Sequence, residues 1–192
     1  MNISARGSRQ PKIDISRLEF RRLSPDCRRE AFICGYTRIE GYFRELAEVE
    51  HNALHARVVT AHLDGNPDPV GFFSMSIKTE PEDLFERTTS LFPRLKSRFH
   101  QKSLLVVHLR WVAVMSDLHR RGVGTALMGR AIDDFYEVTD RTGIAALTLQ
   151  PISRDASAFY ASLGFSVFGD GELPPMFLPA ETVMQVRERA GI

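Results

Sequence analysis

Two glycines and two arginines lie close together in the segment His119–Thr125. Gly122 and Gly124 stand two residues apart, where an apolar run has ended and a helical pattern begins. Glycine lets a backbone approach an anion closely, and the first N–H groups of a helix have no partners inside that helix. Arg120 and Arg121 add positive charge beside these groups. The segment therefore predicts a phosphate-binding turn.

The same glycines allow other interpretations. A nucleoside triphosphatase loop would need a Gly-Lys-Ser/Thr sequence, and this segment contains no lysine. A dinucleotide-binding fold would have a third glycine where Leu127 stands. A Gly-x-Gly turn can also serve only to pack a helix close to a strand. The spacing alone leaves this structural role open beside phosphate binding.

The turn must be positioned by the strand before it and the helix after it. Leu104–Val114 is a nearly continuous apolar run rich in β-branched residues, which is typical of a strand buried on both faces. Gly124–Val138 carries apolar residues at helical spacing. Ile144–Gln150 predicts another buried strand, and Arg154–Leu163 predicts a short helix.

The N-terminal half predicts an arm and two helices. Residues 1–15 are polar and rich in Arg and Ser, so we expect a flexible arm, followed by a single domain over residues 16–192. Ser24-Pro25-Asp26 can cap a helix that ends near Gly35, and a second helix is predicted over 39–51.

The remaining segments predict strands and one insertion. Ala56–Leu63 and Val70–Lys78 form a predicted hairpin, and Phe165–Phe168 and Met176–Leu178 are predicted final strands. Residues 79–103 indicate an insertion with a short helix around 84–91. This order predicts an α/β (α+β) fold in which a mixed sheet has helices on both faces.

Composition narrows the class of protein. The chain has 192 residues, 43% of them hydrophobic, and a formal net charge of +1, so no global field marks it as a nucleic-acid binder. The first ten residues lack the apolar core of a signal peptide, and no apolar run is long enough to span a bilayer. Cys27 and Cys34 lie in the first predicted helix, too far apart for a disulfide, so we expect reduced thiols in a cytoplasmic protein.

A resemblance to a known family gives the turn a more definite role. The string His119–Leu127, preceded by Val112-Ala113-Val114, resembles the central motif of the GCN5-related N-acetyltransferases. That motif has Gln or Arg, two free residues, Gly, one free residue, and Gly or Ala, and His119 stands where Gln or Arg is usual. The segment Asp155–Phe165 resembles the family's second motif, with Asp155 in place of the more usual Asn.

The resemblance implies acetyl-CoA as cosubstrate and direct transfer of its acetyl group to an amine. It implies a sheet of six or seven strands with a splay between the fourth and fifth strands, where Leu109–Val114 and Ile144–Gln150 part to admit the pantetheine arm. It also implies a set of cofactor-binding residues: Val112, Ala113, Val114, His119, Arg120, Arg121, Gly122, Val123, Gly124, Thr125, Asp155 and Phe159.

Tyr160 is the predicted catalytic residue. A phenol at hydrogen-bond distance can protonate the departing thiolate, whose free pKa is about 8.5. The alternative is a core aromatic on an amphipathic helix. No general base is evident, and His108, Asp117 and Glu80 stay open as candidates. An α-amine, with a pKa of about 8, can also lose its proton to water.

No metal is expected. His51 and His55 stand four residues apart, as two ligands on one helix face would, but no third ligand accompanies them in the sequence.

The N-terminal half resembles a narrower branch, the bacterial toxin acetyltransferases. The matching segments are Phe32–Gly35, Tyr42–Leu46, Ala56–Thr60, Val70–Ser74 and Leu173–Pro179. This resemblance implies acetylation of the amino acid on a charged tRNA, and restraint by an antitoxin protein with a ribbon-helix-helix part. The basic stretch Arg87–Arg110 would suit contact with an acceptor stem. Trp111 departs from the branch, which often carries Arg there.

Three functions therefore remain open. The first is an enzyme that acetylates aminoacyl-tRNA, with an antitoxin as partner. The second is an N-acetyltransferase for a small-molecule or peptide amine. The third is a sensor that binds acyl-CoA without catalysis. Each is compatible with a homodimer.

Overall fold

The computed structural model describes residues 11–81 and 103–191. Its seven strands form one mixed sheet in the order β1-β2-β3-β4-β5-β7-β6. The strands are β1 (Leu18–Arg22), β2 (Arg57–Leu63), β3 (Pro69–Pro81), β4 (Ser103–Val114), β5 (Ala146–Leu149), β6 (Ser166–Val167) and β7 (Met176–Pro179). Neighbouring strands are antiparallel except β4 and β5, which run parallel. The predicted α/β fold with a mixed sheet is confirmed.

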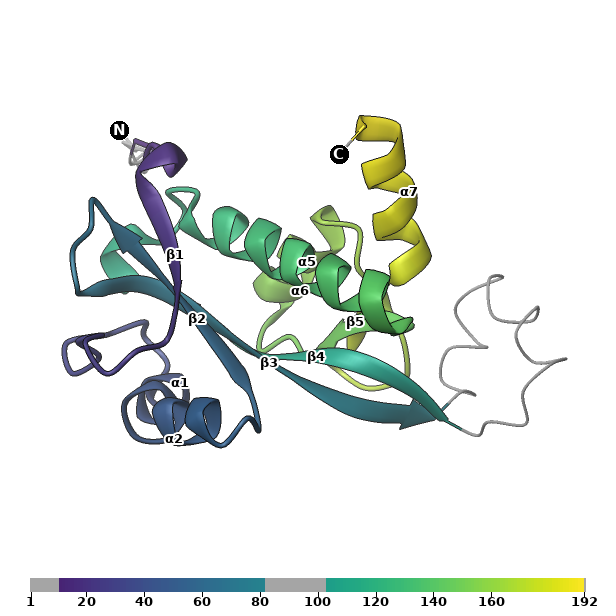
Figure 1. The fold of residues 1–192 in the computed structure, drawn as a ribbon, viewed down its shortest axis with the longest axis horizontal. Helices are drawn as coiled ribbons and strands as arrows, with labels where there is room; N and C mark the ends of the chain where they lie inside the picture. The colour runs from purple at the N-terminus through teal and green to yellow at the C-terminus, as the bar shows by residue number, and fades with distance from the viewer. Residues whose placement is uncertain (1–10, 82–102, 192) are drawn as a thin grey trace, which may run out of the picture.

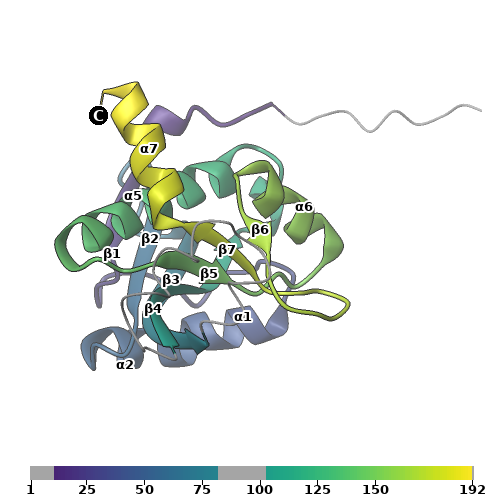
Figure 2. The ribbon, with the colours of Figure 1, turned by 90° about the vertical axis from the view of Figure 1, so that its right-hand side faces the viewer.

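Helices cover both faces of the sheet (Figures 1 and 2). One face carries α1 (Thr37–Gly41), the π-helical turn η2 (Tyr42–Leu46) and α2 (Ala47–Asn52). The other face carries the long helix α5 (Val123–Thr142), with α6 (Arg154–Ser162) and α7 (Ala180–Ala190) on the same side. Two short 3-10 turns, η1 (Ile15–Arg17) and η3 (Ser116–Leu118), precede β1 and α5. None of the helices described is long and apolar enough to cross a membrane.

Side chains that alternate along the strands fill two main cores, and a smaller buried cluster contains Val106, Ala146, Phe168 and Phe177. Phe73 of β3 and Leu127 of α5 belong to the larger core on the α5 face, whereas Phe72 belongs to the core beneath α1 and η2. The rings of Phe43 and Phe72 stack with centroids 3.9 Å apart, which fixes η2 against the sheet. Because neighbouring residues of β3 and β4 serve opposite cores, these strands read as continuous apolar runs.

The strands β4 and β5 pair over only three residues and then separate. Their paired residues are Val107 with Leu147, His108 with Thr148, and Leu109 with Leu149. The next residue, Arg110, is an extra residue in β4, because Ser74 of β3 pairs with Trp111 and Met75 pairs with Leu109. A bulge bends a strand and increases its twist. The predicted splay between the fourth and fifth strands is therefore confirmed, and it begins at this bulge.

The first predicted helix does not form. Residues 23–36 contain turns but no helix. Their backbone is held by distant partners, since Leu23 N donates to Val58 O and Arg28 N donates to Pro67 O. The inference that Cys27 and Cys34 lie in one helix is wrong for the same reason, although both are free cysteines, and both are buried. Tertiary packing has overridden the local capping signal here.

The strand β1 and the helix α7 were not predicted. The strand β1 is a charged edge strand with the sequence Leu-Glu-Phe-Arg-Arg, whose alternation is hard to recognise. The helix α7 packs its Arg187 over the ring of Tyr136 on α5. The predicted short helix around 84–91 lies outside the described residues. Residues 1–10 of the predicted arm also lie outside them.

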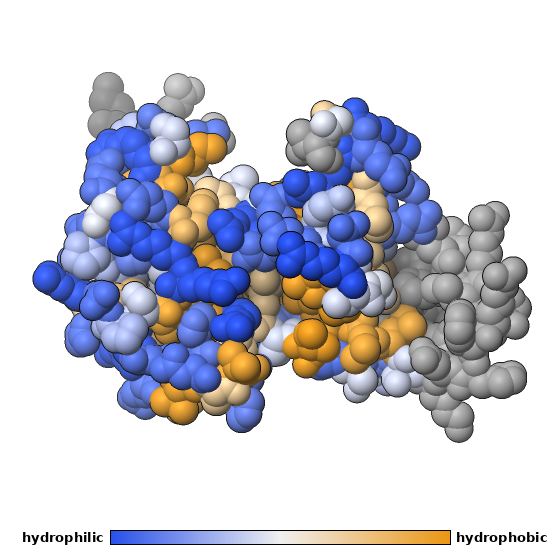
Figure 3. All heavy atoms as spheres, viewed as in Figure 1, coloured by the Kyte–Doolittle hydropathy of each residue, from blue (hydrophilic) through white to orange (hydrophobic). Residues whose placement is uncertain are grey.

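The surface seen in Figure 3 is mostly hydrophilic, with apolar areas along its lower side. Several of the exposed large apolar side chains lie on two structures: Leu46, Val49 and Leu54 on or just after η2 and α2, and Ile77 and Leu105 on β3 and β4. The others are spread over the described surface: Ile15, Ile33, Tyr36, Ile152, Val167 and Val186.

Candidate active site

On the side of β4 that faces away from β3, the backbone groups beyond Leu109 are not paired with β5. Met115 N donates to Val70 O, across the β3 side of the strand. Successive residues of a strand direct their N–H and C=O groups to opposite sides. Val112 and Val114 therefore direct theirs toward the gap left by β5, whereas Ala113 directs its groups to β3. The side chain of Ala113 is buried in the core beneath α1. An extended amide-bearing ligand can add to β4 along this gap.

The turn after η3 opens α5 with an uncapped first turn. Arg120 and Gly122 both adopt left-handed backbone, with φ of 59° and 98°. Gly122 is the N-cap residue of α5, and no side chain caps that end. By contrast, the hydroxyl of Ser153 caps α6 by accepting from Ala156 N. The first N–H groups of α5 thus stay available to an anion, and the helix dipole favours negative charge at this end.

The polar side chains of the turn point in three directions. His119 Nε2 lies 2.8 Å from Val114 O, so it carries the ring proton and donates it to the end of β4. Arg120 pairs with Asp155 of α6 across 3.6 Å, and both side chains are almost fully exposed. Such an exposed pair contributes little to stability. Arg121 Nε donates to Pro11 O, away from the first turn of α5.

Gly124 marks where the first turn of α5 meets the gap. A Cβ at this position would lie 3.8 Å from Val114 and 4.0 Å from Phe159. Phe159 of the second motif therefore lies close to the first turn of α5. Val123, next to it, is fully buried in the larger core, whereas Thr125 is exposed. Of the predicted cofactor-binding residues, Val123 could act only through its backbone, whereas Ala113 directs its side chain to the core beneath α1 and its backbone groups to β3.

Tyr160 lies half-buried on α6, beside the larger core. Its ring contacts Phe159 and Phe165, with centroids 5.4 and 5.9 Å away. Burial raises the pKa of its phenol to about 12. A phenol with so high a pKa stays protonated throughout the neutral range, as a proton donor must.

The opposite face of the same strands carries a second polar group, which joins the candidate base His108 to Thr148. His108 Nδ1 lies 3.1 Å from Thr148 Oγ1, and the Thr148 hydroxyl donates to Val107 O across 3.3 Å. Nδ1 of His108 therefore donates to Thr148, which leaves Nε2 as the free acceptor. Burial, with Lys78 and Arg110 nearby, lowers the pKa of His108 to about 4. His108 is thus neutral at pH 7 but too weak a base to take a proton from an ammonium group.

An ion pair holds the bulge of β4 against α2. Arg110 donates to both carboxylate oxygens of Glu50, over 2.6 and 3.2 Å. Tyr42 of η2 donates its hydroxyl to Glu50 across 3.0 Å and lies 2.9 Å from Ser74 Oγ. Bidentate geometry of this kind gives specificity as well as energy. Glu50 and Arg110 are 60 residues apart in the sequence, so spacing could not connect them.

The other candidate site residues do not lie together at the gap where β4 and β5 separate. Glu80 pairs with Lys78 on the outer part of β3, and Asp117 is exposed in η3. His51 Nδ1 accepts from Val58 N, so this histidine ties α2 to β2. Among the described residues, no group of three or more His, Cys, Asp or Glu side chains is placed to share a metal ion. The basic residues between Arg87 and Lys102 lie outside the described ranges.

Comparison with known families gives the site its context. The family described as "Acetyltransferase (GNAT) domain" matches residues 55–167, which include the separating strands β4 and β5, the turn before α5, and α6. The chain belongs to this family. It is an acetyltransferase, and acetyl-CoA is the cosubstrate of GNAT enzymes. A search of curated proteins gives no match.

Several solved structures share this fold. A tyrosine-to-phenylalanine mutant of KacT superimposes with a TM-score of 0.77 at 17% identity, covering 88% of this chain and 99% of KacT. AtaT complexed with acetyl-methionyl-tRNAfMet gives a TM-score of 0.78 at 17% identity, covering 88% of this chain and 98% of AtaT. AtaTR bound with acetyl-CoA gives 0.74 at 19% identity, with coverage of 89% and 98%.

Proposed function

We propose that this GNAT chain transfers acetyl from acetyl-CoA directly to the α-amino group of an aminoacyl-tRNA. The observation that carries the transfer is the uncapped first turn of α5, which opens beside the gap between β4 and β5. The backbone of residues 122–125 would hold the diphosphate of the coenzyme there. Val112 and Val114 would pair with the amides of its pantetheine arm.

Transfer requires a proton for the leaving sulfur and a donor for the developing oxyanion. Tyr160, whose phenol stays protonated at neutral pH, would protonate the thiolate as the C–S bond breaks. The Val112 N–H, directed into the gap, would donate to the oxyanion. The amine attacks in its neutral form and loses its proton to water, because the pKa of His108 is too low for it to serve as the base.

The acceptor is inferred from the structural neighbours. AtaT was solved with acetyl-methionyl-tRNAfMet, and AtaT toxin was solved bound to the C-terminus of the antitoxin AtaR with acetyl-CoA. These proteins are nearly spanned by the superposition, at 17% identity. The proposal includes restraint of this chain by an antitoxin partner. The toxin branch often carries Arg at the position of Trp111. In this chain Arg38 lies over the Trp111 ring, 5.6 Å from its centroid, so this part of the site differs from that branch.

A substitution at Gly124 tests the proposed diphosphate-binding site. Gly124→Glu places a carboxylate against a diphosphate, so we expect CoA affinity in calorimetry to fall by roughly a hundredfold or more. Gly124→Ala is the matched control, because its Cβ meets only ordinary contacts at 3.8 and 4.0 Å, and binding within a fewfold of wild type is expected. Full affinity in Gly124→Glu would show that the diphosphate binds elsewhere.

The acceptor is tested by following the acetyl group itself. The protein is incubated with radiolabelled acetyl-CoA and a mixture of charged tRNA, uncharged tRNA, polyamines and peptides. Label on charged tRNA that is released by mild alkaline deacylation, together with growth arrest on expression, is expected. Label on a polyamine or peptide instead would favour the second function, a small-amine N-acetyltransferase. Coenzyme binding without transfer to any of them would favour an acyl-CoA sensor.

A further inference from the structure

The segment just before β1 is joined by two hydrogen bonds to the turn that precedes α5. Ile13 N donates to Arg121 O across 2.9 Å, and Arg121 Nε donates to Pro11 O across 3.1 Å. The two partners are 110 residues apart in the sequence. The pair of bonds therefore fixes the position of Arg121, which stands between the two left-handed residues of the turn.

Two apolar side chains of the same segment support the turn. Ile13 is half-buried against the larger core. The Cγ2 methyl of Ile15 would lie 3.9 Å from a Cβ at Gly122, so it covers the N-cap of α5. Left-handed backbone is costly at a non-glycine residue such as Arg120 and persists only where its surroundings hold it. Residues 11–15 supply part of those surroundings.

The other end of the segment is anchored on the β2–β3 turn. Arg17 Nε donates to Asp64 Oδ1 across 2.8 Å, and Asp64 N donates to Arg17 O across 3.2 Å. Between the anchors, Asp14 caps η1 by accepting from the backbone N and hydroxyl of Ser16. The segment is thus held at both ends and stiffened in the middle.

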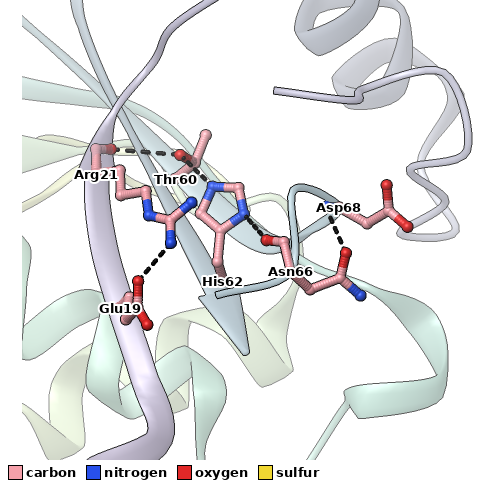
Figure 4. Close-up of polar contacts among 6 residues, drawn as sticks. All are labelled: Glu19, Arg21, Thr60, His62, Asn66 and Asp68. Carbon is pink, nitrogen blue, oxygen red and sulfur yellow. Dashed lines mark hydrogen bonds and ion pairs between the residues drawn. The ribbon is translucent and has the colours of Figure 1, made fainter. Parts of the chain in front are cut away.

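The β2–β3 turn that serves as anchor is itself braced by a buried histidine (Figure 4). His62 is 2% exposed, and its Nδ1 lies 2.8 Å from Asn66 O. Its Nε2 lies 2.8 Å from Thr60 Oγ1. Asn66 Oδ1 in turn accepts from Asp68 N. A satisfied buried network of this kind rigidifies the turn.

We propose that residues 11–17 are a positioning brace, which holds the diphosphate-binding turn of α5 in its binding conformation by linking it to the β2–β3 turn. The inference rests on the proposed function, because it assigns the turn at 120–122 to the coenzyme. In this arrangement Arg121 is a positioning residue, which fixes the turn through its own backbone and Nε. The brace contacts no reacting atom, so its loss affects coenzyme binding and leaves the chemical step intact.

The test removes one contact of the brace at a time from the full chain. Ile13→Pro deletes the N–H that donates to Arg121 O while keeping an apolar side chain, and Ile13→Val is its control. Ile15→Ala removes the methyl over Gly122. Its control is Val186→Ala on α7, because Val186 is as exposed as Ile15, at 59% against 60%. The readouts are the Kd of CoA by calorimetry and the thermal midpoint without ligand.

Kinetics separate a positioning role from a general loss of structure. We expect Ile13→Pro to raise the Kd for CoA and the KM for acetyl-CoA by roughly fivefold, which is the effect of one lost hydrogen bond. The kcat at saturating acetyl-CoA should stay within about twofold of wild type. Transfer from S-acetylpantetheine, which lacks the diphosphate, should be unchanged. Ile15→Ala should shift the same constants in the same direction.

Wild-type values of Kd and KM in Ile13→Pro would overturn the brace. If Ile13→Pro does not fold, Ile15→Ala decides, and an unchanged Kd there has the same meaning. A fall in kcat with S-acetylpantetheine would also overturn it, because the effect would then not depend on the diphosphate. Failure of wild-type protein to bind CoA would remove the proposed function and the brace together, whereas wild-type binding with unaffected variants removes the brace alone.

Discussion

Tyr160 shows how burial selects one chemical role for a side chain. Nothing but desolvation shifts its pKa, and desolvation raises it to about 12. An α-amine becomes neutral above a pH of about 8, and the phenol is still protonated there and can donate its proton. Its neighbour Phe159 lies close to Gly124 in the first turn of α5, so Tyr160 is near the proposed coenzyme site.

Tyr160→Phe removes the proton donor and keeps the ring. We expect kcat to fall by about a hundredfold, because general acid catalysis contributes on that order, while the Kd for CoA changes little. Tyr36→Phe, on a tyrosine that is 47% exposed and away from α6, should leave both constants unchanged. Steady-state kinetics with calorimetry provide the check. An unaltered kcat in Tyr160→Phe would exclude the phenol from the reaction.

At the scale of elements, the close packing of α5 on β3 positions the first turn of α5 beside the gap between β4 and β5. A Cβ at Gly71 would lie 2.7 Å from the Leu127 side chain and 2.9 Å from Ala113 O. The second of these atoms belongs to backbone, so it cannot move aside without shifting β4. The glycine thus fixes the spacing between the helix that carries the turn and the strand that faces it.

Gly71→Ala should therefore destabilise the fold, by about 1–3 kcal/mol, as overpacking of a filled core does. Gly129→Ala is the matched control, because a Cβ there meets nothing within 4 Å and lies inside α5. It should stabilise the protein by up to about 1 kcal/mol, since alanine is the better helix former. Urea unfolding of both variants gives the comparison. Equal stability of Gly71→Ala and wild type would mean that α5 is not closely packed at this point.

At the scale of the whole molecule, three histidines in the described part of the chain couple the fold to pH. Burial is the main cause that lowers the pKa of His51, His62 and His108, the last to about 4. In the unfolded chain these pKa values return to about 6.5. As the pH falls below about 6.5, the unfolded chain binds more protons than the folded one, so stability is lost. For His108 the loss is complete near pH 4.

His108→Asn should flatten this dependence. The asparagine amide can replace the Nδ1 donor to Thr148 but cannot be protonated in this range, so the fall in unfolding free energy between pH 6.5 and 4.5 should be smaller than in wild type. His55→Asn, at an exposed histidine, is the control and should keep the wild-type slope. Urea unfolding across this range measures both. A slope in His108→Asn as steep as in wild type would contradict the burial of His108 as the cause.

Sequence alone determined the strand, turn and helix that carry the coenzyme motif. The apolar run that became β4, the glycines at 122 and 124, and the periodic pattern of α5 are local signals, and each gave the element that formed. The second motif and its helix α6 were equally local. The family match over 55–167 agrees with both motifs.

Tertiary structure alone decided how this site is enclosed. The bulge at Arg110, its ion pair with Glu50, and the bonds from residues 11–13 to Arg121 join residues far apart in the chain. The segment 23–36 lost its predicted helix because its backbone found partners on β2 and the β2–β3 turn. Local patterns report the conformational preference of neighbouring residues. The energy of these contacts exists only once distant segments have been brought together, so no window of sequence contains it.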